Sequence, residues 1–223
     1  MISVAIDGPA GAGKSSLAKR LARDLGYIYV DTGAMYRAVG LYALRAGADP
    51  ADRAAVTALL PGIRLRLAVV DGAQHIYLND EDVSGLIRTE QVGMAASAVG
   101  ANPDVRAFLL ELQRETARTG NVLMDGRDIG TVILPHATVK IFLTTSSEAR
   151  ARRRWLEYQA AGRPESYEEV LADVKQRDEQ DAGRAAAPLR KAEDAVLLDT
   201  SALDFEQSLA AMKEIIQKRV EGL

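Results

Sequence analysis

The sequence of 223 residues contains no cysteine and only two histidines, His75 and His136. The lack of cysteine excludes disulfides, thiolate zinc sites and cysteine nucleophiles. It also fits a reducing cytoplasm, which is where we expect the protein to act. The two histidines lie far apart in sequence without obvious ligand partners, so surface or hairpin roles are expected for them rather than a metal site.

Long apolar runs and an excess of positive charge are also missing. No run approaches the length that spans a membrane, and the first residues carry no basic leader or cleavage pattern, so neither a membrane partner nor secretion is expected. The formal net charge of -3 at pH 7 argues against a dedicated nucleic-acid binder, which usually carries a basic excess. The 48% of hydrophobic residues is enough for the core of a single domain over residues 1–223.

Short apolar segments alternate with segments of helical periodicity along most of the chain. Five apolar segments have the length and composition of buried strands, and they cover residues 2–7, 27–30, 121–125, 138–144 and 195–199. This alternation predicts an α/β fold with a five-stranded parallel sheet and helices on both faces. Such sheets bind ligands beyond the carboxyl ends of their strands. Four of the five ends carry an aspartate or a threonine, namely Asp7, Asp31, Asp125 and Thr144.

Two local features modify this pattern. IRLRLAVV (63–70) and HIYL (75–78) flank Asp71-Gly72, which is a hairpin signal, and the polar stretch 79–85 would be the exit loop. We therefore predict a small β-rich insertion over residues 62–88. Near the end of the chain, Ser201 and Asp204 have the spacing of a capping box for the last helix.

The stretch GPAGAGKSS, residues 8–16, follows the first strand and matches the phosphate-binding loop pattern Gly-x-x-x-x-Gly-Lys-Ser. Its glycines let backbone N–H groups point at phosphates, and the helix that begins near Lys14 directs its positive end to the same place. Lys14 adds a cation, and the Ser15 hydroxyl can bind Mg²⁺. The residues expected to bind a nucleoside triphosphate are Gly8, Pro9, Ala10, Gly11, Ala12, Gly13, Lys14, Ser15 and Ser16.

Other classes of P-loop protein fit less well than a small kinase. No asparagine is followed by lysine, as in the guanine-binding motif, and Asp125 is followed by glycine rather than by the glutamate of a motor ATPase. Phosphoryl transfer to a second substrate needs arginines that neutralise charge. Thr32, Arg37 and Arg127 follow predicted strand ends, so we interpret them as functional.

Two more groups of charged residues lie on predicted helices. One helical face carries Arg150, Arg153 and Arg154, and another carries Arg177, Asp181 and Arg184. The spacing of the first group alone favours a solvated surface. The spacing of the second group favours neither a surface nor a functional role.

Four segments resemble those of bacterial cytidylate kinases, in order and at similar spacing: GPAGAGKSS, DTGAMYRA (31–38), DGRDIGTV (125–132) and KQRDEQDAGRAAAPL (175–189). The resemblance covers essentially the whole chain. It implies transfer of the γ-phosphoryl group of ATP to CMP or dCMP, with Mg²⁺, by a monomer. It also implies a P-loop kinase fold with a monophosphate-binding region over 32–110, which includes the insertion, and a short helical lid over 148–186.

The resemblance assigns roles to individual residues as well. It implies that the monophosphate is held by Thr32, Arg37, Ser97, Arg106, Arg127, Asp128, Arg177, Asp181 and Arg184. Asp128, with Ser97 and Arg106, would read cytosine, whose amino group a carboxylate complements. Arg153 and Arg154 would contact ATP phosphates, and the catalytic group would be Lys14, Arg127, Arg154 and Arg184. Asp125 would act on Mg²⁺ through water, with a purely structural strand-end role as the alternative.

Two rival functions stay open on the residues themselves. One is a kinase of the same fold that acts on another acceptor, such as a coenzyme precursor. The other is a nucleotide sensor that binds ATP without turnover. The arginines beyond the P-loop disfavour the sensor, because ATP alone needs no second phosphate site.

Overall fold

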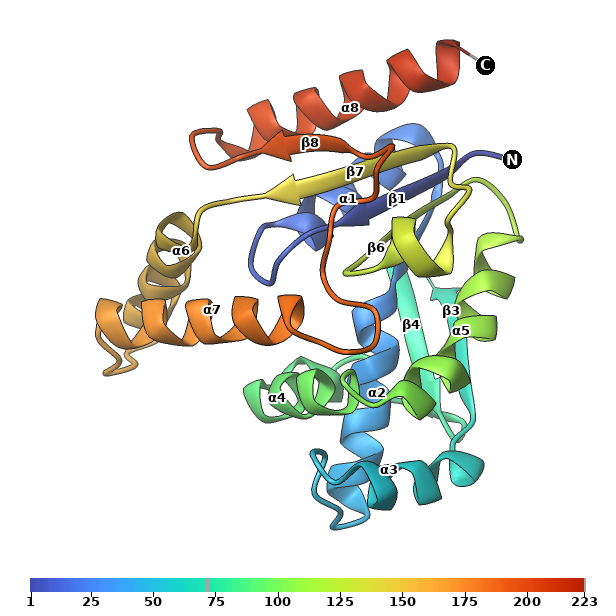
Figure 1. Ribbon diagram of the computed structural model, residues 1–223, viewed down its shortest axis with the longest axis vertical. Coiled ribbons are helices and arrows are strands. Elements are labelled where there is room, and N and C mark those ends of the chain that lie inside the picture. Colours follow the sequence, from blue (N-terminus) through green and yellow to red (C-terminus); the bar gives the residue numbers. More distant parts are fainter. Residues whose placement is uncertain (71–72, 223) are drawn as a thin grey trace. The chain divides into compact units, whose positions relative to one another are not determined.

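The computed structural model describes residues 1–70 and 73–222, which fall into two compact units (Figure 1). The first unit combines Met1–Tyr29 with Gly120–Leu223, and the second is Val30–Thr119. In the described ranges, no helix has both the length and the apolar character needed to cross a membrane.

A five-stranded sheet is the centre of the first unit, with the strand order β2-β6-β1-β7-β8. The pairs β1–β6, β1–β7 and β7–β8 are all parallel. The strands are β1 (Ser3–Asp7), β2 (Ile28–Asp31), β6 (Val122–Gly126), β7 (Val139–Thr144) and β8 (Val196–Asp199). This parallel sheet and its flanking helices confirm the predicted α/β fold, and β2 leads from the first unit into the second.

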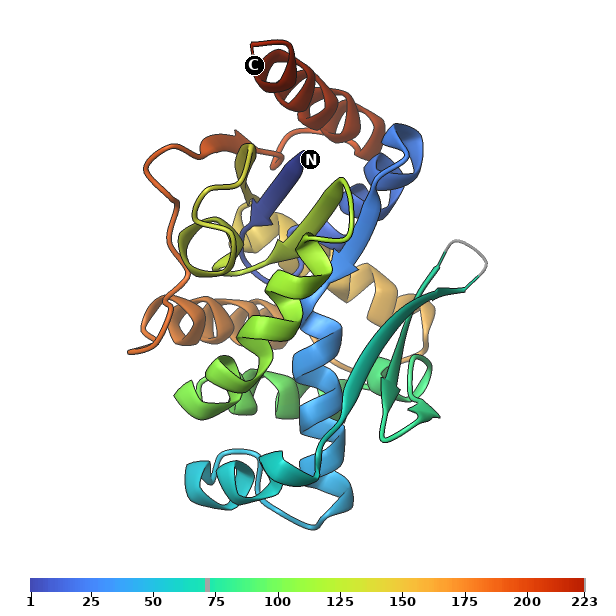
Figure 2. The same cartoon turned by 90° about the vertical axis from the view of Figure 1, so that its right-hand side faces the viewer.

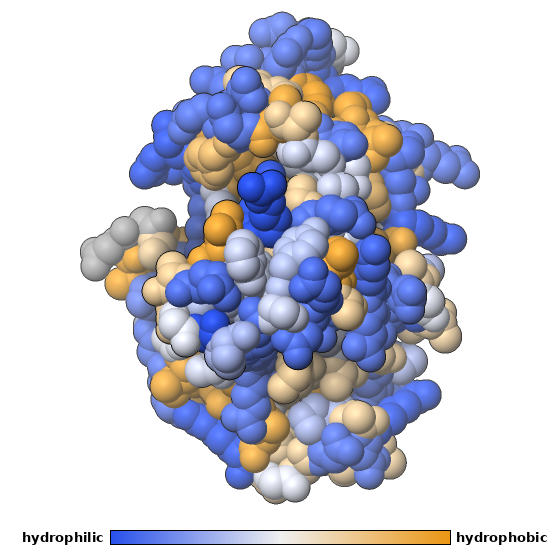
Figure 3. All heavy atoms as spheres, turned by 90° about the vertical axis from the view of Figure 1, so that its left-hand side faces the viewer, coloured by the Kyte–Doolittle hydropathy of each residue, from blue (hydrophilic) through white to orange (hydrophobic). Residues whose placement is uncertain are grey.

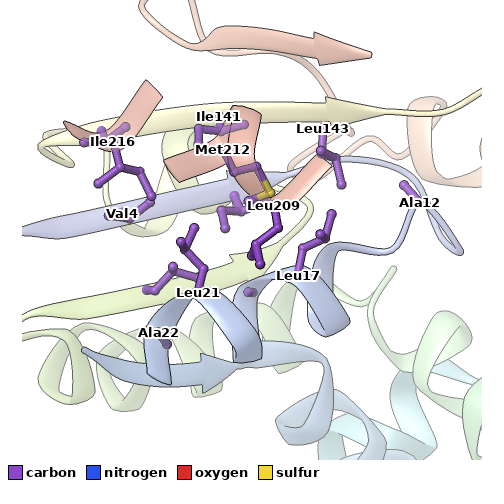
Figure 4. Packing of buried hydrophobic residues seen from close by; sticks show 14 residues of the cluster. Val4, Ala12, Leu17, Leu21, Ala22, Ile141, Leu143, Leu209, Met212 and Ile216 are labelled. Atoms are coloured by element: carbon purple, nitrogen blue, oxygen red, sulfur yellow. The ribbon is translucent and has the colours of Figure 1, made fainter. Parts of the chain in front are cut away.

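One face of the sheet is covered by α1 (Lys14–Leu25) and α8 (Phe205–Glu221), as Figure 4 shows. Leu21 of α1 and Met212 of α8 are fully buried there, together with Val4 and Ile6 of β1. Because side chains alternate along a strand, Asp7 points to the opposite face. A π-helical turn, Ile129–Ile133, contacts β1.

Two helices after β7, α6 (Ser147–Ala160) and α7 (Tyr167–Ala182), pack against each other. Trp155 and Tyr167 meet edge to face, with ring centroids 6.4 Å apart. Ser166 caps α7 in a capping box with Glu169. On the side of the molecule drawn in Figure 3, hydrophilic residues are interspersed with smaller hydrophobic areas.

The cap of α8 differs from its prediction. The Asp204 carboxylate accepts a hydrogen bond from the Gln207 backbone N–H at 2.8 Å, and the Gln207 side chain accepts one from the Asp204 N–H at 3.0 Å. Ser201 instead donates to the Asp199 carboxylate at 2.6 Å. The predicted box of Ser201 and Asp204 is wrong because the side chain that reaches back to a cap must be long, and Gln207 supplies it.

The second unit combines helices with a small antiparallel sheet. Its helices are α2 (Thr32–Arg45), α3 (Arg53–Leu59), α4 (Glu90–Val99) and α5 (Pro103–Ala117), with short 3₁₀ turns at Leu60–Gly62 and Leu86–Arg88. Its strands are β3 (Leu65–Val70), β4 (Ala73–Leu78) and β5 (Glu81–Asp82). β3 and β4 run side by side in Figure 2, so the expected β-rich insertion is present.

The two predicted turns of this insertion have different outcomes. The hairpin residues Asp71 and Gly72 lie outside the described residues. The stretch expected as an exit loop, 79–85, contains β5, so that prediction is wrong in part. Asn79 and Asp80 take positive φ values of 48° and 70°, which suits a two-residue hairpin turn between β4 and β5.

Candidate active site

The P-loop between β1 and α1 is shaped by its glycines. A Cβ added to Gly8 would lie only 2.0 Å from the Leu143 carbonyl oxygen, so no other residue fits against β7 there. Gly13, which precedes α1, has a φ of 86°, a left-handed conformation that L side chains rarely adopt. The sequence pattern therefore corresponds to two distinct steric requirements of the loop.

Lys14 lies inside this loop, with 5% of its surface exposed. Its Nζ donates hydrogen bonds to the carbonyl oxygens of Gly8 and Pro9, both at 2.7 Å. Burial lowers the pKa of Lys14 well below its usual value, and the Arg127 charge lowers it further, while Asp125 acts in the opposite direction. Phosphate oxygens beside the amine would favour its charged form for the same electrostatic reason.

Ser15 and Asp125 form the part of the site that could hold a metal. The Ser15 Oγ donates to Asp125 Oδ2 at 2.8 Å, and the Tyr29 hydroxyl donates to Asp125 Oδ1, also at 2.8 Å. Hydroxyl and carboxylate oxygens are the hard donors that Mg²⁺ takes, together with water and phosphate oxygens, so the pair fits this ion. Within residues 1–70 and 73–222, no cluster of three or more histidine or acidic side chains is placed to bind a metal.

Asp181 on α7 joins two arginines from different parts of the first unit. Its side chain is 1% exposed and accepts from Arg127 Nε at 2.7 Å, and an Arg184 Nη lies 2.6 Å from its other oxygen. Burial works to raise the pKa of Asp181, but the charges of Arg127 and Arg184 hold it below its ordinary value. Arg177 acts in the same direction. Three arginines around one carboxylate leave a net positive charge, which suits an anionic substrate.

The remaining predicted residues of the first unit are more scattered. Asp128 follows Arg127 directly and is buried, with 4% of its surface exposed. Arg153 is exposed and Arg154 is half-buried on α6, and neither makes a hydrogen bond or ion pair with any residue that the structure describes. The charges of Asp125, Arg127 and Asp181 all act on the pKa of Lys14, so these residues lie near its amine. Arg153 and Arg154 do not belong to this group.

The other predicted residues belong to the second unit. Thr32 is the buried first residue of α2, and Ser97 lies half-buried on α4. Arg37 and Arg106 each donate to a backbone carbonyl oxygen at 3.1 Å. A Cβ added to Gly93 of α4 would lie 3.1 Å from an Arg37 nitrogen, so a glycine lets the guanidinium pass close to that helix.

Arg150 is a residue whose place the sequence interpretation missed. It is 5% exposed, and its guanidinium donates to the carbonyl oxygens of Ala10 at 3.0 Å and Thr145 at 2.9 Å. It also forms an ion pair with Asp178 of α7 at 2.5 Å. The interpretation of this helical face as solvated surface is wrong for Arg150, because its spacing to Arg154 carries no information about partners far away in sequence.

Comparisons with known proteins agree on one family. A family model described as cytidylate kinase matches residues 4–218. A cytidylate kinase of Geobacter sp. (strain M21) is 50% identical over 219 residues, which are 98% of this chain and 94% of that protein. A cytidylate kinase of Carboxydothermus hydrogenoformans is also 50% identical, over 220 residues and 99% of each chain.

A solved structure, that of an uncharacterized protein from Eubacterium ventriosum ATCC 27560, is similar in fold alone. The TM-score is 0.53 at 13% identity, with 97% of this chain and 99% of that chain covered.

Proposed function

The chain belongs to the cytidylate kinase family, and from this premise we propose that it transfers the γ-phosphoryl group of ATP to CMP or dCMP. The products would be ADP and CDP or dCDP. The observation that carries the proposal is that an arginine cluster around Asp181 lies close to the P-loop. Arg127 of that cluster is near enough to Lys14 of the loop to lower its pKa. A donor phosphate and an acceptor phosphate both need such cations.

The donor side of the reaction would be served by the P-loop, residues 8–16, and by Arg153 and Arg154. Backbone N–H groups and the start of α1 suit the phosphates of ATP. We propose that Lys14 exchanges its two loop carbonyls for phosphate oxygens, which would restore the charge that burial disfavours. The region 148–186 would act as the lid that limits the access of water.

The acceptor side would be served by the residues that the resemblance implies. They are Thr32, Arg37, Ser97 and Arg106 in the second unit and Arg127, Asp128, Arg177, Asp181 and Arg184 in the first. Cytosine offers an amino donor to a carboxylate, whereas uracil would present a carbonyl oxygen to Asp128, so this residue should select the base. The arginines would neutralise charge on the monophosphate and on the transferring phosphoryl group.

The divalent metal of this family would be Mg²⁺, held by Ser15 and, through water, by Asp125. When bound, it would neutralise charge on the phosphate oxygens of ATP. Lys14 and the arginines orient the two phosphates, and no side chain is required as a general base. We also propose a monomer that acts in the cytoplasm, an expectation that rests on the resemblance and on the absence of cysteine.

The test is a coupled assay of ADP release with ATP and Mg²⁺ against CMP, dCMP, UMP, AMP and GMP. We expect strong turnover with CMP and dCMP and little turnover with the other three. Acceptor-dependent turnover only with other metabolites would favour a kinase for another substrate. ATP binding without any acceptor-dependent turnover would favour a sensor, and both outcomes would contradict the proposal.

A further inference from the structure

Asp7, the last residue of β1, holds the segment that carries Arg127 and Asp128. The Ile129 backbone N–H donates to Asp7 Oδ1 at 2.7 Å, and the Gly130 N–H donates to Asp7 Oδ2 at 2.8 Å. Each carboxylate oxygen thus takes one amide of the π-helical turn. The carboxyl group is buried, with 4% of the residue exposed.

The same residue also holds the other end of this segment. In the parallel pairing of β1 with β6, Asp7 lies opposite Gly126. Gly126 precedes Arg127, and Ile129 follows Asp128. The two residues therefore form a short arch, defined as Arg127–Asp128, whose two ends are both fixed against Asp7.

The packing around the arch leaves little freedom for another arrangement. A Cβ added to Gly130 would lie 3.3 Å from Asp7 Oδ2 and 3.1 Å from the Lys140 side chain. Glycine at this position lets the turn approach both side chains. From the arch, Arg127 reaches Asp181 at 2.7 Å, and Asp128 is buried. The orientation of both side chains depends on how the arch is held.

We propose that Asp7 is a positioning residue for the reaction, whose carboxylate fixes the arch in the geometry that binds the monophosphate and selects its base. The inference rests on the proposed function, since it assumes that Arg127 and Asp128 serve the acceptor. Asp7 itself need not touch a substrate. Among common side chains, only an ionised carboxylate offers two acceptor oxygens without a donor, which is what two converging N–H groups require.

The charge state of Asp7 supports a role near neutral pH. Burial raises its pKa to about 6, against the lowering effect of the two backbone N–H groups. Asp128 raises the pKa further and Lys14 lowers it, while Lys140 beside the turn is paired with Asp194. The experiments below are therefore set at pH 8, where the carboxyl group is ionised.

The first measurement is amide hydrogen exchange by NMR on the full chain, because it does not depend on activity. In Asp7→Asn, one N–H would face an NH₂ group, so we expect the Ile129 and Gly130 amides to exchange about tenfold faster or more, relative to Leu123 in β6. Val4→Ala is the matched control, since this buried residue of β1 points to the other face of the sheet. Equal protection of both amides in wild type and Asp7→Asn would overturn the proposal.

The second measurement is kinetic and uses CMP and UMP as acceptors. We expect Asp7→Asn to lower kcat/KM for CMP by about tenfold or more, with a smaller change in KM for ATP. The preference for CMP over UMP should shrink, as it should in Asp128→Ala. Val4→Ala should lower the urea midpoint but keep this preference. An equal loss for ATP and CMP would place the effect on the P-loop and overturn the proposal.

A third variant guards against a failure of Asp7→Asn to fold. Gly130→Ala leaves the carboxylate in place but pushes the turn away from it, so the same shift in base preference is expected. An unchanged preference would overturn the proposal. Wild-type protein without CMP turnover would contradict the proposed function instead, and the exchange data would still decide whether Asp7 fixes the arch.

Discussion

At the scale of single residues, the largest loss of activity is expected when Arg127 is replaced. Its side chain is 22% exposed and is bound to Asp181, so it joins the arch to α7. We predict that Arg127→Ala lowers kcat/KM for CMP by about 10³-fold, since arginines that stabilise a transferring phosphoryl group supply effects of this size. Folding should survive, because Arg184 still pairs with Asp181. Steady-state kinetics and urea unfolding on the same preparation would check both statements.

A matched control for this change is Arg23→Ala on α1. The Arg23 side chain is 73% exposed and lies 3.8 Å from Asp24, so its loss should leave turnover and stability close to wild type. Near-native turnover in Arg127→Ala would show that Arg127 takes no part in the reaction. A loss of the same size in Arg23→Ala would show that the assay responds to charge in general.

Residue roles were predictable where they follow from local position. Arg127 comes directly after a buried strand, and that placement alone indicated a functional arginine. Arg150 was not predictable in this way. It is buried because it meets Ala10 and Asp178, which are far from it in sequence, and helical spacing says nothing about such partners.

At the scale of elements, Arg150 connects the P-loop, α6 and α7. We predict that Asp178→Asn destabilises the protein, because it leaves a buried guanidinium without its counter-charge. Breaking a buried pair costs about 3–5 kcal/mol. Since the Asp178 side chain is 30% exposed and water can partly replace it, we expect a loss of about 1–3 kcal/mol in the free energy of unfolding, measured in urea.

The control for this prediction is an exposed pair that joins the same two helices. Lys175 of α7 lies 3.3 Å from Glu148 of α6, and both side chains are more than half exposed. Glu148→Gln should change stability little, because water already surrounds the pair. If Asp178→Asn were no more destabilising than Glu148→Gln, the ion pair of Arg150 with Asp178 would not contribute to the stability of the protein.

The main helices and strands were predictable from the sequence, but the short elements between them were not. The helix α1 begins at Lys14, as the phosphate-binding loop pattern predicted. The strand β5 was not predicted, because its two residues are too short for alternation to be visible. The π-helical turn also had no signal, since it is held by Asp7, 122 residues earlier in the chain.

At the scale of the whole molecule, the core was predictable because one physical rule dictates it. Apolar strands that alternate with amphipathic helices can bury their surfaces in few ways, and a covered parallel sheet is one of them. The division into two units at Tyr29 and Gly120 did not follow from that rule. It depends on which side chains contact each other across long stretches of chain, and sequence spacing does not contain this information.

The stability of the whole molecule should depend on pH through Asp7. Burial raises the pKa of this carboxyl group from 3.8 to about 6 in the folded protein. Between these two values the folded state binds a proton that the unfolded state lacks, so this group makes stability fall as the pH rises. The fall amounts to about 3 kcal/mol over that window.

Other carboxyl groups also titrate, so the prediction concerns the difference between wild type and Asp7→Asn. Asp181, for example, has a lowered pKa, so the stability that it contributes is present above its unfolded value and is lost at lower pH. We expect wild type to lose stability relative to Asp7→Asn as the pH rises from 4 to 7, as measured by urea unfolding at several pH values. If the difference in stability between the two proteins stayed constant with pH, Asp7 would have the same pKa in the folded and unfolded states. Burial would then not govern its charge.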